Sequence, residues 1–435
     1  MPTFYARAAI ILSILTPVAA IAWRSSSAVV FYAFVALSLA ALAHNGLRRF
    51  PGTAPAYPWL AAFALAAPLI SIAVTDTHVY GLRGSELEKG LRFALALPVL
   101  WLLIRVPARS LRQLQWGLIA AACIASLMII VNVLLTHTDD PRAVIAQIGA
   151  HYNAVTAANL TLLFGVSALM TLPWTLSAWP SAERFVKILA FALSVVATLL
   201  SGTRSSWMLL PICLLSLFLG REMKTRTRLA WLVGGVLVLV LAGVALYEVN
   251  QRFVEIASDV QQFDNGHLKD TSVGIRMQLW QAALHIFHEH PWLGIGLANF
   301  RDALHDLAAQ GVITQFVAEN FGEPHNDLLG ALAGYGLLGL VSMMALYWLP
   351  AVWFYRRLQT VSPDMRAAVR IGLLLCLGYT AFSLTEMMFR NMRSVPIYST
   401  MVVILMAASR ARAEDVNQDV PELDGQGFAK QKTSC

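Results

Sequence analysis

The chain has 435 residues, of which 57% are hydrophobic and only 13% carry a charge. A soluble globular protein has about 25% charged residues, because even a large core needs a charged surface. The composition therefore excludes an ordinary soluble protein and favours helices that face lipid. The four cysteines lie inside apolar runs or at the last position, so we predict neither disulfides nor a cysteine metal site.

Apolar runs of membrane-spanning length recur along the chain, where a bilayer core of about 30 Å needs roughly 20 residues per helix. The first run has no convincing cleavage site, so we interpret it as a span and not as a signal peptide. The fold class predicted is an all-α polytopic membrane protein with about twelve transmembrane helices. The candidate spans are 8–23, 28–43, 58–75, 92–104, 114–135, 154–174, 184–200, 206–219, 229–247, 328–349, 367–385 and 394–409.

The positions of the charges predict how these spans are oriented. With a cytoplasmic N-terminus, 20 of the 32 Lys and Arg residues fall inside and 17 of the 25 acidic residues fall outside. The positive-inside rule favours this arrangement, which leaves both termini in the cytoplasm of a bacterial inner membrane. The net charge of +7 is thereby explained by topology, so we predict a phospholipid bilayer and no nucleic acid as partner.

The spans divide the chain into four predicted parts. Residues 1–247 hold the first nine transmembrane helices, 248–327 form one large helical periplasmic loop, 328–410 hold the last three helices, and 411–435 form a disordered cytoplasmic tail. Amphipathic stretches near 251–263, 274–290 and 299–310 predict helices in the loop. A loop of that length in a compact protein is usually functional.

The spans contain almost no ionisable residues, whereas transporters usually place such residues in mid-membrane. Glu88 and Arg92 lie at the mouth of the fourth span, and Glu386 and Arg390 lie at the outer end of the eleventh. Polar groups thus gather at the outer membrane face. This distribution favours chemistry on a membrane-anchored substrate over translocation.

Two arginines on the outer side are candidate anion-binding residues. Arg204 lies in the turn Ser201-Gly-Thr-Arg-Ser-Ser206, where hydroxyls and backbone N–H groups accompany the cation. Arg276 lies one helical turn before Trp280, on the same face of a predicted loop helix. Each has a simpler interpretation, as a snorkelling arginine or as a solvated residue beside a core tryptophan.

Histidines of the loop are candidate metal ligands and candidate bases. His285, His288 and His290 have no recognised zinc-ligand spacing, so we expect surface histidines and no metal. His325 follows a proline and comes just before the tenth span. A helix N-terminus disfavours the imidazolium, so we expect a lowered pKa and a neutral general base there, with a helix-capping role as the alternative.

Together these segments resemble the O-antigen ligase and polymerase superfamily. His325-Asn326, then nine residues and Gly336-Leu-Leu-Gly339, is similar to the family's His-Asn motif. Arg276 with Trp280 and the run from His290 to Phe300 resemble its large periplasmic loop, and the Ser-Gly-Thr-Arg turn resembles its first arginine motif.

The resemblance implies an enzyme that uses an undecaprenyl-pyrophosphate-linked O-antigen outside the inner membrane. Because the pyrophosphate already activates this donor, neither a metal nor another cofactor is implied. In the ligases of the family the acceptor is a sugar hydroxyl of the lipid A-core oligosaccharide. His325 would take the proton of that hydroxyl, Arg204 and Arg276 would bind the pyrophosphate, and a single displacement would invert the anomeric carbon.

The remaining candidate residues have supporting roles under the same resemblance. Trp280 supports the loop helix or one face of a sugar, and Asn326 shapes the site. Glu88 and Arg92 resemble polar residues near the place where family members take up their lipid substrate.

Three alternative functions stay open. An O-antigen polymerase would use a growing glycan as acceptor, and many polymerases have two long outer loops. An O-linked protein oligosaccharyltransferase would use a protein, and those family members are generally longer. A flippase for lipid-linked glycans would need cations along a central cavity, which the spans lack.

Overall fold

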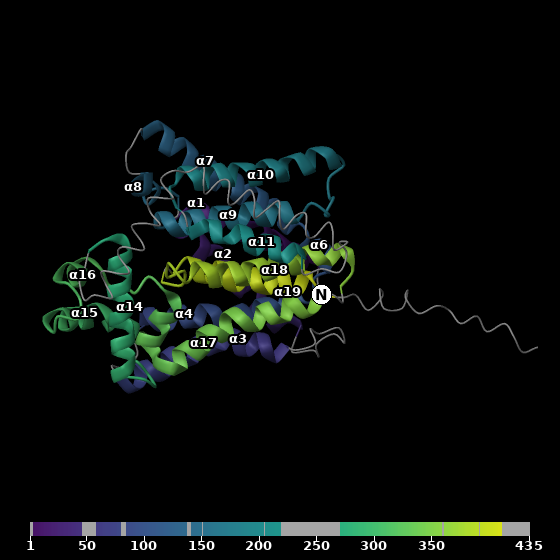
Figure 1. Ribbon diagram of the computed structural model, residues 1–435. Helices are drawn as coiled ribbons and strands as arrows, with labels where there is room; N and C mark the ends of the chain where they lie inside the picture. The colour runs from purple at the N-terminus through teal and green to yellow at the C-terminus, as the bar shows by residue number, and fades with distance from the viewer. Residues whose placement is uncertain are drawn as a thin grey trace, which may run out of the picture.

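The computed structural model describes residues 3–45, 58–79, 84–136, 141–149, 151–203, 205–218, 270–358, 361–390 and 392–410. All regular elements in these ranges are helices, which confirms the all-α class. Long helices lie side by side in a bundle, and three shorter helices, α14, α15 and α16, gather at one end of it (Figure 1). We name this the loop end of the bundle, and the other the opposite end.

The first half of the chain forms the larger number of elements. They are α1 (Thr3–Ala22), α2 (Ser26–Asn45), α3 (Pro58–Val79), α4 (Gly84–Ala94), α5 (Ala96–Leu103), α6 (Ala108–Leu111), α7 (Leu114–Thr136), α8 (Pro141–Ile145), α9 (Ala154–Met170), α10 (Pro180–Leu200), the 3₁₀ helix η1 (Ser205–Met208) and α11 (Leu209–Phe218).

The second half supplies the loop helices and the last three helices of the bundle. They are α14 (Ser272–Glu289), η2 (Leu297–Asn299), α15 (Phe300–Ala309), α16 (Gln315–Asn320), α17 (Asp327–Arg357), α18 (Pro363–Phe382) and α19 (Ser394–Ala408). The predicted loop helices near 274–290 and 299–310 are thus present as α14 and α15. The predicted stretch at 251–263 lies outside the described residues.

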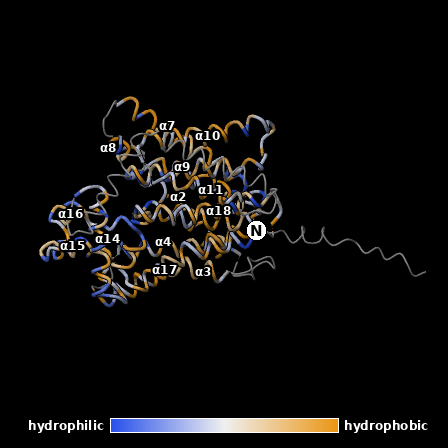
Figure 2. The backbone as a smooth tube through the Cα atoms, viewed as in Figure 1, coloured by the Kyte–Doolittle hydropathy of each residue, from blue (hydrophilic) through white to orange (hydrophobic). Residues whose placement is uncertain are grey.

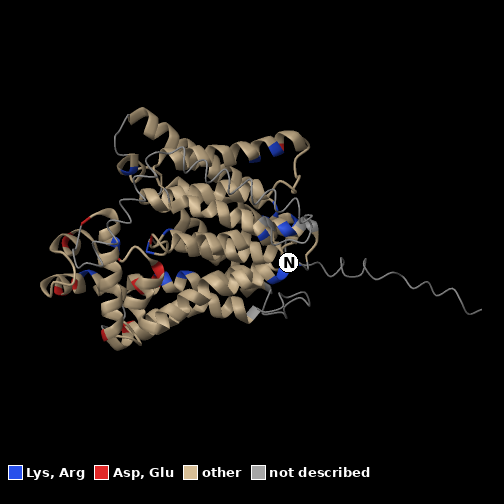
Figure 3. Ribbon diagram, in the orientation of Figure 1, with Lys and Arg blue, Asp and Glu red and all other residues tan. Residues whose placement is uncertain are grey.

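Six of the described helices are long and apolar enough to cross a membrane, and three shorter apolar helices accompany them. Apolar residues run along the whole length of the bundle, while α14, α15 and α16 are richer in polar residues (Figure 2). Among the described residues, charged side chains gather at the two ends of the bundle and leave its middle nearly free of charge (Figure 3). The chain is therefore a multi-pass membrane protein.

The predicted total of about twelve spans stays a prediction. The run at 229–247 and the tail from 411 lie outside the described residues, and a helix occupies each of the other predicted runs. The fourth run, expected at 92–104, begins earlier and is divided into α4 and α5. Hydropathy misses α4 because its first two turns carry Glu86, Glu88 and Lys89.

A break in α17 joins the long helices to the loop. Gly336 has φ 62° and ψ −153° inside α17, a left-handed conformation that favours glycine. The residues around it bond with the segment from 291 to 296: Leu337 donates its N–H to the carbonyl of Pro291 at 2.8 Å, and Gly296 donates to the carbonyl of Gly334 at 2.7 Å. The loop is thus anchored on the first half of α17.

Candidate active site

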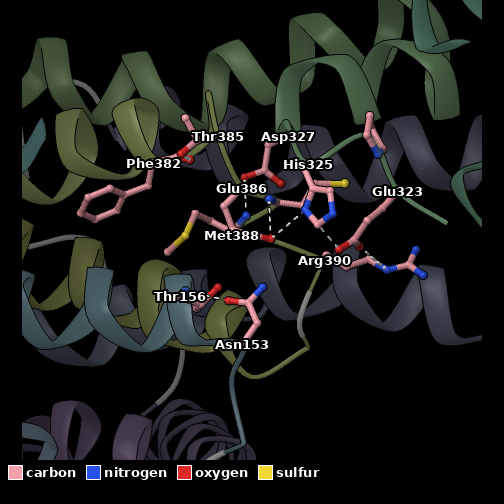
Figure 4. Close-up of polar contacts among 12 residues, drawn as sticks. Asn153, Thr156, Glu323, His325, Asp327, Phe382, Thr385, Glu386, Met388 and Arg390 are labelled. Atoms are coloured by element: carbon pink, nitrogen blue, oxygen red, sulfur yellow. Dashed lines mark hydrogen bonds and ion pairs between the residues drawn. The ribbon is translucent and has the colours of Figure 1, made fainter. Parts of the chain in front are cut away.

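The candidate site lies at the loop end, where the residues before α17 meet the turn between α18 and α19. We name residues 383–393 the α18–α19 turn. Nδ1 of His325 lies 3.5 Å from Oε1 of Glu386 and 3.8 Å from Oε1 of Glu323. Nε of Arg390 lies 3.0 Å from Oε2 of Glu323. Figure 4 shows the imidazole between the two carboxylates, with Arg390 beyond Glu323.

Local sequence fixes the position of His325. Its φ is 49°, one of only two positive values among the described non-glycine residues. The next residue, Asn326, caps α17, because its Oδ1 accepts the N–H groups of Leu328 and Leu329 at 3.0 and 3.1 Å. Trp280 donates its indole N–H to the carbonyl of Pro324 at 3.1 Å. His325 is therefore held by a cap on one side and by the loop helix α14 on the other.

Asp327 connects this segment with the α18–α19 turn. Its buried carboxylate accepts the backbone N–H of Met388 at 2.9 Å and that of Phe389 at 3.2 Å. The hydroxyl of Tyr347, also buried, donates to the same carboxylate at 2.8 Å. Since Glu386 comes two residues before Met388, Asp327 determines where that carboxylate meets His325.

Arg276 brings a cation from α14 to this cluster. It is half-buried, and burial lowers the pKa of its guanidinium, while the charge of Glu386 acts in the opposite direction. The charge of Arg142, on α8, lowers the pKa of Arg276 further. Arg276, Glu386 and Arg142 are therefore close enough to interact electrostatically.

The carboxylates control the basicity of the imidazole. Burial by itself lowers the pKa of His325, but the charges of Glu386 and Glu323 outweigh it, and the pKa is raised above its usual value. The expected lowering by the start of α17 is therefore wrong. A helix terminus carries a partial charge, whereas two full negative charges lie within 4 Å of the ring. Burial also raises the pKa of Glu323, against the charges of His325 and Arg390.

The other predicted residues lie elsewhere. Arg92 and Glu88 form an ion pair on α4 with atoms 2.6 Å apart, and Arg92 also donates to the carbonyl of Met392 in the α18–α19 turn. They support that turn, and no contact joins them to His325. Arg204 lies outside the described residues. Two residues before it, the carbonyl of Gly202 accepts a bond of 3.0 Å from Arg142.

Histidines that could be metal ligands lie in several places in the described part of the chain. His288 and His290 are exposed, and Nε2 of His285 lies 3.5 Å from Oε1 of Glu289. The one group there with ligand atoms close enough to share a cation is Glu323, His325 and Glu386, whose atoms lie within 4.8 Å of one another. Arg390 already neutralises Glu323 in this group.

Sequence reasoning named Arg276, Trp280, His325 and Asn326, which the structure brings together through α14 and the start of α17. It did not assign roles to Glu323, Glu386, Arg390 or Arg142. The sequence does mark two of them, because Glu386 and Arg390 are charged residues at the end of the apolar run 367–385. The contact of Glu386 with His325 and that of Arg390 with Glu323 join residues more than 60 positions apart in the chain, which no local pattern reveals.

These features define a multi-pass membrane protein with a cluster of ionisable side chains at one end of its bundle. Residues 189–344, about a third of the chain, match a family model described as O-antigen ligase. This segment of the chain is similar to the O-antigen ligase family.

A curated protein of Haemophilus influenzae, itself uncharacterised, is similar to this chain. It is 22% identical over 221 residues, which cover 50% of this chain and 55% of the relative. The chain thus matches about half the length of this relative.

Proposed function

We propose that the protein is an O-antigen ligase. It would transfer a glycan from undecaprenyl pyrophosphate to a sugar hydroxyl of the lipid A-core oligosaccharide, at the periplasmic face of the inner membrane. The observation that supports this best is the placement of His325 between Glu386 and Glu323, beside Arg276, inside the segment that matches the family. A base beside a cation is what this displacement requires.

In the proposed reaction His325 accepts the proton of the acceptor hydroxyl. Its Nδ1 faces the two carboxylates, so Nε2 is the nitrogen that would take the proton. The carboxylates would orient the ring and stabilise the imidazolium that forms, as the aspartate of a catalytic triad does. The acceptor oxygen bonds to the anomeric carbon as the bond from that carbon to the pyrophosphate breaks, which inverts the configuration.

Arg276 and Arg204 would bind the departing pyrophosphate. Negative charge grows on the bridging oxygen as the bond breaks, and a guanidinium placed there lowers the barrier. We expect Arg276→Ala to reduce transfer about a hundredfold, and Arg276→Lys to recover only part of it, because lysine lacks the planar fork of donors. Transfer in purified protein that proceeds at the wild-type rate in Arg276→Ala would exclude this role.

The central test uses purified protein with lipid-linked glycan and lipid A-core. His325→Ala should lose transfer by about a hundredfold or more. His305→Ala changes an exposed histidine on α15 and serves as the matched control. Equal activity of the two variants would rule out His325 as the base.

A gene deletion followed by lipopolysaccharide electrophoresis separates the ligase from its alternatives. Loss of the whole ladder, with lipid-linked polymer still present, identifies a ligase. A single-repeat band identifies a polymerase, and a normal ladder with loss of protein glycosylation identifies an oligosaccharyltransferase. Export of donor from liposomes without an acceptor identifies a flippase.

We also propose that transfer needs no metal, because the leaving group is already activated and Arg390 neutralises part of the carboxylate cluster. Transfer should therefore continue in EDTA. Loss in EDTA and recovery with zinc would assign the Glu323, His325 and Glu386 group to a metal instead.

A further inference from the structure

Three aromatic rings lie in a row from the surface of the loop to His325. The ring centres of Phe316 and Phe321 are 6.4 Å apart with their planes at 64°, and those of Phe321 and His325 are 6.0 Å apart at 76°. Both contacts are edge-to-face, an arrangement that ring quadrupoles favour. Phe316 belongs to α16 and Phe321 follows its last residue, so this short helix brings two phenyl rings to the candidate base.

The packing of α16 explains why the first phenyl ring stays exposed. Val317 and Ala318 are buried at the loop end, and Oγ1 of Thr314 caps the helix by accepting the N–H of Val317 at 3.3 Å. Phe316 precedes this buried pair and is 46% exposed. Phe321 is half-buried and packs against the apolar cluster of the loop end. One ring is thus open to a ligand, and the next is held in place.

The surface around Phe316 is polar. Gln315 and Asn320, on the same helix, are exposed, and α16 lies beyond α14, away from the long helices of the bundle (Figure 1). Amide side chains are unfavourable in hydrocarbon, so contact with lipid does not explain this exposed ring. A single exposed phenylalanine needs no explanation by itself, but this one begins a row that ends at His325.

Two polar side chains accompany the phenyl rings. Asn320 donates from Nδ2 to the carbonyl of Phe316 at 2.9 Å, and Arg301 donates to the carbonyl of Glu319 at 3.2 Å. Both side chains are exposed, and each has further hydrogen-bonding capacity, because an amide oxygen accepts and a guanidinium has five N–H donors. A sugar ring matches this combination: its C–H groups are attracted to the face of an aromatic ring, and its hydroxyls bond to polar groups at the edge.

The row leads to the nitrogen that would take the proton. The His325 side chain is 24% exposed, so a substrate can reach it from the surface. We propose that Phe316 and Phe321 form a stacking subsite for the acceptor oligosaccharide, in which Phe321 contacts the sugar that presents its hydroxyl to His325 and Phe316 contacts a neighbouring sugar. The proposal rests on the proposed function for the identity of the acceptor.

Binding is tested with the full-length protein in nanodiscs of zwitterionic phospholipid and with lipid-free core oligosaccharide as the probe. Phe316→Ala should weaken binding about tenfold, because one sugar loses its ring partner. Phe316→Tyr keeps a ring and should bind as wild type does. Phe316→Leu keeps apolar surface without a ring and should bind as weakly as Phe316→Ala. Wild-type affinity of Phe316→Ala or of Phe316→Leu would overturn the subsite.

A matched control and a second variant complete the binding test. Trp292→Ala removes another exposed aromatic ring of the loop end, and its affinity should equal that of wild type. Phe321→Leu keeps the apolar packing and removes the ring beside His325, so binding should weaken about tenfold with unchanged thermal unfolding. Wild-type affinity of Phe321→Leu would remove Phe321 from the subsite.

Kinetics decide whether the subsite serves the acceptor or the donor. With lipid A-core as acceptor, Phe316→Ala should raise the acceptor KM about tenfold and leave kcat and the donor KM unchanged. A raised donor KM, or a dependence on Phe316 seen with lipid-free O-antigen glycan and not with core oligosaccharide, would overturn the assignment to the acceptor. Because oligosaccharide binding is measured without transfer, a wild-type protein that binds core oligosaccharide through Phe316 but transfers no glycan would overturn the ligase function alone.

Discussion

His325 lies between two carboxylates, and this placement sets the pH range in which it accepts a proton. Its pKa is raised, so the imidazolium persists to higher pH than in a free histidine. A protonated imidazole has no lone pair for the acceptor hydroxyl. We therefore expect kcat/KM to fall as the pH drops, with the midpoint above the usual histidine pKa of about 6.5.

Glu386 should affect both the pKa of His325 and the stability of the imidazolium that forms during transfer, and replacing Glu386 separates these two effects. In Glu386→Gln the loss of a negative charge should move the midpoint of this profile to lower pH, because the imidazolium loses its partner. The plateau at high pH should fall about tenfold, because the neutral amide stabilises the developing imidazolium less. Glu319→Gln, an exposed glutamate of α16, should change neither quantity. An unshifted midpoint in Glu386→Gln would contradict the proposed pairing.

We predict that Asp327 stabilises the fold and takes no part in proton transfer. Asp327→Asn replaces one carboxylate oxygen with an amide nitrogen, which donates hydrogen bonds and accepts none. At least one of the three donors to Asp327, the N–H groups of Met388 and Phe389 and the hydroxyl of Tyr347, therefore loses its acceptor. We expect the free energy of unfolding to fall by about 2–4 kcal/mol, because a buried network loses a partner. Tyr347→Phe removes one donor only and should cost about 1 kcal/mol. Thermal unfolding in detergent measures both, and equal melting of Asp327→Asn and wild type would contradict this account.

At the scale of elements, the break in α17 holds the loop in place. A Cβ at Gly336 would lie 2.3 Å from the carbonyl carbon of Trp292, and its φ of 62° is unfavourable for alanine. Gly336→Ala should therefore displace the segment from 291 to 296 and reduce transfer strongly. Limited proteolysis should then cut the loop between α14 and α15 faster than in wild type.

Gly311 provides the control for that experiment. Its φ of 73° is similar, but a Cβ there meets nothing within 4 Å. Gly311→Ala should cost only the backbone strain, about 1–2 kcal/mol, with normal transfer. If the two variants behave alike, strain and not the contact with Trp292 explains the need for glycine in α17.

The elements also show what sequence patterns can and cannot predict. Long apolar helices such as α7 follow directly from composition, since lipid demands an apolar surface along their whole length. Composition does not predict the short helices α8 and α16 or the polar start of α4. Packing at the loop end, and not contact with lipid, determines which of their residues are apolar. His325 was predicted from its place before a helix, whereas Glu386 becomes its neighbour only through the bonds of Asp327.

At the scale of the molecule, the separation of charge is consistent with a site that works at a membrane surface. The described acidic residues lie mostly at the loop end, with the candidate site, and the middle of the bundle is nearly free of charge (Figure 3). A path for a charged substrate through the bundle would require ionisable groups in that middle. The arrangement favours two lipid-anchored substrates that meet at the loop end.

The predicted orientation can be tested with two tryptophans at opposite ends of the bundle. Trp292, beside the break in α17, is 71% exposed, and Trp179, before α10, is 77% exposed. Three predicted spans separate them, 184–200, 206–219 and 229–247, so the two positions should lie on opposite sides of the membrane. The positive-inside rule places Trp292 in the periplasm and Trp179 in the cytoplasm.

Cysteine labelling in whole cells measures this directly. In a chain whose four native cysteines are changed to alanine, Trp292→Cys should react with a membrane-impermeant maleimide in intact cells whose outer membrane has been permeabilised. Trp179→Cys should react only after the inner membrane is opened, and its exposure ensures that a negative result reports topology and not burial. Labelling of neither in intact cells would remove the span at 229–247. Labelling of Trp179→Cys alone would invert the protein and place His325 in the cytoplasm, where a periplasmic ligase has no acceptor.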